Sequence, residues 1–117
     1  MSNVKFTGPK LVRDKIPAQA LRRGDPMKTR KAGREELPRL LLEKVLEETV
    51  EVLNAVGAAR VTRKSMREAV MTEFPDLVDA VEEVKKHFKL SAREINHART
   101  LKRRRKGGFE QRLVWIG

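Results

Sequence analysis

The sequence has no cysteine, no tyrosine and a single tryptophan among its 117 residues. The absence of cysteine excludes disulfide bonds and cysteine-ligated metal sites, and it fits a reducing, cytoplasmic location. Because aromatic residues make up only 4% of the chain, the core must be built from aliphatic side chains. No apolar run approaches the roughly 18 residues of a membrane-spanning helix. The first residues, MSNVKFTGPK, lack the apolar segment of a signal peptide. We therefore expect a cytoplasmic protein of one domain, over residues 1–117, that does not enter a membrane.

Positive charge, in contrast, is abundant. Lys and Arg together number 27 against 16 acidic residues, which gives a formal net charge of +11. Such an excess favours polyanionic partners, which include nucleic acid, an acidic membrane surface and a phosphorylated small molecule. The charge alone does not choose among these classes.

Caps and helix stops predict an all-α fold, a helical bundle of three longer helices and a short N-terminal one. The short helix is expected to start with Asp14 as its N-cap and to end at Gly24. The first long helix is expected over about residues 35–56, with Gly57 as its stop. A polar loop should follow over residues 58–64.

Two capping-box patterns predict the starts of the remaining helices. The pattern S-x-x-E occurs at Ser65 and again at Ser91, and the helices that follow should extend to about Phe88 and Lys106. Pro75 lies inside the first of them, where its missing N–H should kink the helix. Two glycines follow the second, and the terminal FEQRLVWI has an extended character but is too short to assign.

The acidic residues are not spread evenly around these helices. On a helical wheel, Glu47 and Glu51 fall on a side that could face solvent, whereas Glu48 lies between apolar residues. In the next helix Glu73 falls inside the apolar face and Asp76 at its edge. A buried carboxylate without a partner is unfavourable, so it must be neutralised, paired or bound to a metal.

Antiparallel packing of the two helices would let Glu48 and Glu51 meet Glu73 and Asp76. Each pair is three residues apart, so both of its carboxylates project from one patch. Four oxygen ligands around one point suit a hard cation such as Mg²⁺ or Mn²⁺. Two simpler interpretations remain open, namely that the exposed glutamates pair with Lys44 and neighbouring bases, and that the buried acid pairs with an arginine.

These acids form two patterns, K-x-x-E-E-x-x-E at residues 44–51 and E-x-x-D at residues 73–76. Together with KLVRDKIP at 10–17 and KGGFEQRLVW at 106–115, they resemble the MazG-like, all-α nucleoside triphosphate pyrophosphohydrolase superfamily. The two end segments resemble its small "house-cleaning" branch, called phosphoribosyl-ATP pyrophosphohydrolase-like. The resemblance spans about residues 10–116.

This resemblance implies a fold, an activity and a set of site residues. Members hydrolyse a nucleoside triphosphate between its α and β phosphorus atoms to the monophosphate and pyrophosphate, require Mg²⁺ and commonly form dimers or tetramers. By position, Glu48, Glu51, Glu73 and Asp76 match the metal ligands. Glu47 matches a further acid that holds a second metal or orients the attacking water, and it is the candidate catalytic base.

Basic residues are needed to bind the phosphates of such a substrate. The candidates are Arg13, Lys15, Lys44, Lys102 and Lys106, the last of which stands where the family usually has arginine. For each of the five, plain exposure to solvent is an equally open interpretation. Nothing in the sequence selects a base.

Two other functions are consistent with parts of the sequence. The run KRRRK at residues 102–106 is typical of nucleic-acid-binding patches, although a helix C-terminus also favours cations. A phosphoribosyl-ATP pyrophosphatase of histidine synthesis would share the fold and the metal site, but it would not predict the two end segments. His87 and His97 are ten residues apart on different helices, so we interpret both as surface residues and not as metal ligands.

Overall fold

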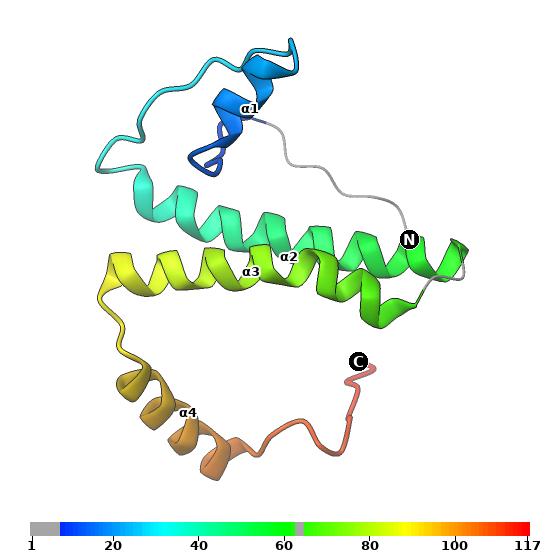
Figure 1. Cartoon of the computed structure of the whole chain (residues 1–117). Coiled ribbons are helices and arrows are strands. Elements are labelled where there is room, and N and C mark those ends of the chain that lie inside the picture. The colour runs from blue at the N-terminus through cyan, green and yellow to red at the C-terminus, as the bar shows by residue number, and fades with distance from the viewer. Residues whose placement is uncertain (1–7, 63–64) are drawn as a thin grey trace. The chain divides into compact units, whose positions relative to one another are not determined.

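The computed structural model describes residues 8–62 and 65–117, and within these ranges it contains four helices and no strand. The helices are α1 (Ile16–Arg22), α2 (Leu37–Thr62), α3 (Met66–Phe88) and α4 (Ala92–Lys106) (Figure 1). The prediction of an all-α chain with three longer helices and a short N-terminal one is confirmed. None of the described helices is long and apolar enough to cross a membrane.

The chain divides into two compact units. Unit 1 comprises Met1–Val84 and unit 2 comprises Lys85–Gly117. The helices α1 and α2 and most of α3 belong to unit 1, whereas α4 belongs to unit 2. That both units make up one domain, over residues 1–117, stays a prediction.

The start of α1 differs from the prediction by one residue. Lys15, not Asp14, is the N-cap, and no side chain caps the helix. Because Pro17 in the first turn has no N–H, fewer donors need a side-chain cap. A backbone turn closed by the carbonyl of Arg13 leads into the helix instead. Gly24 then takes a positive φ of 81° just after the helix, so the predicted stop is confirmed.

The prediction that Gly57 ends the first long helix is wrong. The helix α2 continues to Thr62, so most of the loop expected over 58–64 is helical, and residues 63–64 lie outside the described ranges. The alanines and the arginine that follow Gly57 are good helix formers. Ala59 is also only 3% exposed, and this packing offsets the weak helix propensity of one glycine.

Both serine caps are present in the structure. At the start of α3, Ser65 Oγ accepts a hydrogen bond from the backbone N–H of Glu68 (3.3 Å). At the start of α4 the full capping box forms, because Ser91 Oγ accepts from Glu94 N–H (3.1 Å) and the Glu94 carboxylate accepts from Ser91 N–H (3.0 Å). Gly107, with φ of 79°, follows α4 as predicted. Local sequence therefore determines these helix ends.

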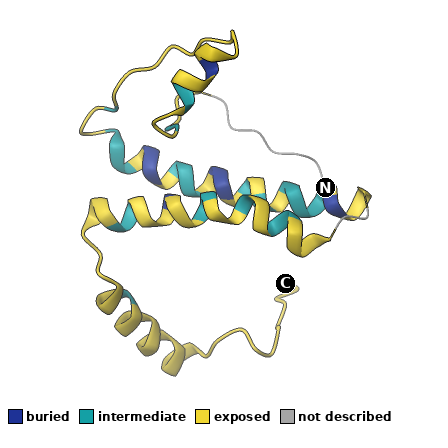
Figure 2. Ribbon diagram, in the orientation of Figure 1, coloured by how far each residue is buried: buried dark blue, intermediate teal, exposed yellow. Residues whose placement is uncertain are grey.

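The helices α2 and α3 lie side by side in unit 1 (Figure 1). The buried apolar residues of the described ranges are few, and most belong to this pair (Figure 2): Ala20, Leu40, Leu41, Ala59 and Ala80. The helix α3 is continuous through Pro75, and a kink there stays a prediction. The buried charged residues of the described ranges are Glu47 and Glu48. The best-protected part of unit 1 therefore contains two carboxylates.

Candidate metal centre

Three carboxylates from two helices converge in unit 1. Glu48 of α2 and Glu73 and Asp76 of α3 each offer an oxygen, and these three oxygens lie within 4.8 Å of one another. Because Glu73 and Asp76 are three residues apart, α3 presents them on one face. The structure thus brings together three of the four predicted ligands. Glu51, the fourth, is exposed and lies outside this group.

The surroundings of Glu73 disfavour the charged form of its carboxyl group. Partial burial raises its pKa above the ordinary value, and the negative charges of Glu51, Asp76 and Glu48 raise it further. Among the described residues no basic side chain forms an ion pair with it. The open interpretation that an arginine pairs with Glu73 therefore has no support in this part of the chain. A cation placed among the three oxygens would supply the missing positive charge.

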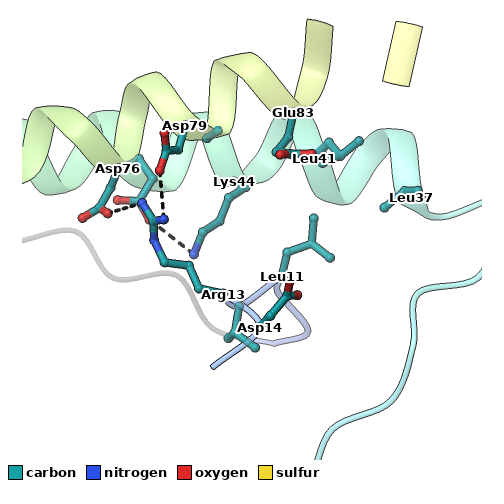
Figure 3. A pocket seen from close by; sticks show the side chains of 12 residues that line it. Leu11, Arg13, Asp14, Leu37, Leu41, Lys44, Asp76, Asp79 and Glu83 are labelled. Carbon is teal, nitrogen blue, oxygen red and sulfur yellow. Dashed lines mark hydrogen bonds and ion pairs between the residues drawn. The ribbon is translucent and has the colours of Figure 1, made fainter. Parts of the chain in front are cut away.

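Arg13 pairs with one member of this cluster, Asp76, and with the neighbouring Asp79 (Figure 3). Its Nη2 lies 2.6 Å from Asp76 Oδ1 and its Nη1 lies 2.9 Å from Asp79 Oδ2. Hydrogen bonds to these two carboxylates raise the pKa of the guanidinium above its ordinary value. Arg13 thus crosses from the segment before α1 to α3 and spans two acids one helical turn apart.

The structure overturns the placement of Glu47 on a side that could face solvent. Glu47 is only 7% exposed, and its carboxylate binds Lys10 Nζ at 2.9 Å and Lys44 Nζ at 3.3 Å. The same Lys44 ammonium also lies 3.3 Å from Glu48 Oε1. The segment before α1 places Lys10 against this side of α2, a contact that a helical wheel does not contain.

A pocket of about 430 Å³ opens between the segment before α1 and the two long helices. Its walls include Glu48 and Asp76 from the carboxylate cluster and Arg13 and Lys44 from the basic candidates (Figure 3). Acidic and basic groups thus face one space. Such a space suits a cation together with the phosphate groups that the cation would hold.

The other three basic candidates do not line this pocket. Lys15 is exposed at the N-cap of α1. Lys102 and Lys106 are exposed on α4 in unit 2. Their roles as phosphate ligands stay predictions. His87 and His97 are also exposed, and neither belongs to the carboxylate group described above.

Two residues of the site were missed by the sequence analysis. Asp79 was detectable, because it continues the spacing of Glu73 and Asp76 by another three residues on the same face of α3. Lys10 opens the motif KLVRDKIP, but nothing in the sequence identifies Glu47 as its partner 37 residues away. The spacing of the acids could have identified Asp79, whereas the contact of Lys10 depends on tertiary packing.

No protein-family model, no curated protein and no solved structure matches this chain. The site therefore has to be interpreted from its own residues, with the resemblance of the four sequence motifs as a hypothesis.

Proposed function

We propose that this chain is a Mg²⁺-dependent nucleoside triphosphate pyrophosphohydrolase, with Mn²⁺ as an alternative metal, that releases pyrophosphate and the nucleoside monophosphate. The observation that carries the proposal is the carboxylate group of Glu48, Glu73 and Asp76. Two of its members, Glu48 and Asp76, line a pocket that Arg13 and Lys44 also line. The motifs that resemble the MazG-like superfamily coincide with these residues. In this proposal the helices form a bundle of the superfamily's type.

The donor set fits a hard divalent cation. All three groups are carboxylates, Glu73 has a raised pKa and no basic partner in the described part of the chain, and the oxygens converge without histidine or cysteine. These properties are those of Mg²⁺ and Mn²⁺ sites. A bound cation would neutralise charge on the phosphate oxygens and acidify water. Glu51 is near enough to act on Glu73 electrostatically, and we keep it as a fourth ligand.

The chain's own basic groups would orient the substrate. Arg13 offers a planar guanidinium suited to bidentate phosphate binding, and Lys44 offers a point charge beside Glu48. Glu47, held between Lys10 and Lys44, is the proposed base for the attacking water. A bound phosphate that attracted Lys44 would leave Glu47 Oε2 free to accept a proton, while Lys10 stayed on Oε1.

A substrate screen tests the proposal directly. Canonical and modified nucleoside triphosphates are incubated with the protein and Mg²⁺ or Mn²⁺, and pyrophosphate and orthophosphate are assayed separately. We expect pyrophosphate as the product, a requirement for metal and loss of activity in Glu73→Gln. Release of orthophosphate alone, or no turnover of any triphosphate, would contradict the proposal. Phosphoribosyl-ATP in the same screen distinguishes the enzyme of histidine synthesis.

A further inference from the structure

The positive charge of the chain is concentrated in unit 2, whereas the carboxylate site belongs to unit 1. Unit 2 contains 11 of the 27 Lys and Arg residues but only two of the 16 acidic residues. It therefore carries +9 of the chain's net charge of +11, although it comprises little more than a quarter of the residues. Unit 1, in which the proposed nucleotide site lies, carries only +2. Binding of a triphosphate in unit 1 thus leaves most of the positive charge unexplained.

The helix α4 carries most of this charge, and its one acidic residue is already hydrogen-bonded. Seven of its residues are basic: Arg93, Arg99, Lys102, Arg103, Arg104, Arg105 and Lys106. Its carboxylate, Glu94, accepts hydrogen bonds from Ser91 in the capping box. In the part of the chain that the structure describes, the basic side chains of α4 form no ion pair, and Arg99 donates to Asn96 Oδ1 (3.1 Å). No residue of α4 is buried.

Stability of α4 does not explain five consecutive cations. A helix C-terminus favours positive charge, and four of the five cations lie in the last turn of α4, but each added cation is also repelled by the others. Side chains three or four positions apart are neighbours, so Lys102 and Lys106 repel each other, as do Lys102 and Arg105. Residues 102–106 therefore crowd like charges beyond what the helix end can use. Crowded, unpaired cations on an exposed surface fit a polyanionic partner.

The distribution of charge around α4 separates two kinds of polyanion. A helix that lies on a membrane needs a continuous apolar face. The apolar residues of α4 offer none, because at about 100° per residue Lys102 and Arg105 fall between Ile95, Ala98 and Leu101 on the same side. Cations on all sides instead suit a helix in a groove between two phosphate strands. We infer that unit 2 binds the phosphate backbone of nucleic acid through α4, independently of the nucleotide site in unit 1.

The segment after α4 contains two exposed aromatic side chains. Phe109 is 95% exposed and Trp115 is 92% exposed. Trp115 is also the only tryptophan of the chain, so its fluorescence reports contact with this segment.

A DNA titration tests the inference. The 117-residue chain is titrated into a labelled duplex DNA of mixed sequence at several salt concentrations. We expect binding whose log affinity falls linearly with log salt, by about 0.9 per phosphate contacted. In the double variant Arg103→Gln/Arg104→Gln the slope should fall by about 1.8. Glutamine keeps a helix propensity close to that of arginine, so circular dichroism should show unchanged helix content.

A matched variant separates a binding surface from a general effect of charge. Arg22→Gln/Arg23→Gln removes the same charge from the end of α1 in unit 1 and should leave the slope and affinity near those of the wild type. Equal losses in the two double variants would overturn the inference. So would salt-insensitive DNA binding, the absence of DNA binding, or binding only to vesicles containing phosphatidylserine. Triphosphate turnover is measured in parallel and should be unchanged in Arg103→Gln/Arg104→Gln.

Discussion

At the scale of single residues, Glu73 determines what the site can hold. Glu73→Gln keeps the size of the side chain but removes its charge, so Mn²⁺ affinity measured by calorimetric titration should fall about tenfold or more. Glu43→Gln, which removes the charge of a partly exposed glutamate paired with Arg39 on α2, should leave the affinity unchanged. Equal Mn²⁺ affinity in wild type and Glu73→Gln would exclude this glutamate as a ligand.

The raised pKa of Glu73 also predicts how stability depends on pH. The folded state holds the proton of this group more tightly than the unfolded state, whose pKa is near the ordinary 4.5. Its contribution to stability is therefore complete below that value and is lost as pH rises through the raised pKa. Without metal, Glu73→Gln should gain thermal stability relative to the wild type as pH is raised from about 4 to about 7. A difference in melting temperature that does not change with pH would contradict this.

Arg13 should act in opposite directions on metal binding and on turnover. Arg13 forms an ion pair with Asp76, so Arg13→Ala should leave that carboxylate available to a metal. Because the pair is partly exposed, and such pairs contribute about 0.2–1 kcal/mol, Mn²⁺ affinity should rise by about 1.5- to fivefold. Turnover of a triphosphate should fall about tenfold or more, since a phosphate ligand is lost. Arg34→Ala, at an exposed residue outside the pocket, serves as the control, and a fall in both quantities would show that Arg13 only supports the fold.

At the scale of helices, Gly57 offers a test of why α2 continues. Its φ is not positive, and a Cβ atom built on it meets no heavy atom within 4 Å. Gly57→Ala should therefore stabilise the protein by about 0.5–1 kcal/mol in thermal or urea unfolding. Gly107→Ala should destabilise it, because the φ of 79° at that position disfavours a side chain. Destabilisation by Gly57→Ala would mean that α2 breaks at this residue.

The same helices show what sequence can and cannot predict here. The capping box of Ser91 and Glu94 was predictable because all of its partners lie within one turn. The convergence of Glu48 with Glu73 and Asp76 was predictable because adjacent helices form one hairpin and periodicity marks their facing sides. The burial of Glu47 was not, since it depends on Lys10 reaching α2 from a segment 37 residues away. The continuation of α2 past Gly57 was not predictable either, because it depends on the packing of Ala59 and not only on local helix propensity.

At the scale of the whole molecule, the small core leaves apolar side chains exposed, and a second copy of the chain would bury them. In the described residues no large side chain is fully buried, whereas Leu42, Leu46 and Leu53 are about half exposed. At about 100° per residue these three leucines lie within about 40° of one another on α2, so they form one apolar stripe. Apolar surface of this kind is typical of an interface between subunits.

We therefore expect a homodimer or homotetramer. Light scattering should give a multiple of the 13.4 kDa chain mass for the wild type. Leu46→Glu places a charge in the middle of the stripe and should give the monomer mass, because an uncompensated charge cannot be buried in an interface. Val61→Glu, which changes an exposed valine near the end of α2, should keep the wild-type assembly. A monomeric wild type at micromolar concentration would contradict the prediction.

The ion pairs of the segment before α1 have a consequence for the order of folding. The hairpin of α2 and α3 closes over a few residues, so its contacts are local and can form early. In contrast, Lys10 meets Glu47 across 37 positions and Arg13 meets Asp76 across 63, which requires the closure of long loops. The carboxylates and Lys44 would thus assemble before Lys10 and Arg13 join them, so that Glu73 and Asp76 would meet Glu48 before Arg13 pairs with Asp76. Divalent cations present during refolding should then accelerate the step that brings the two helices together.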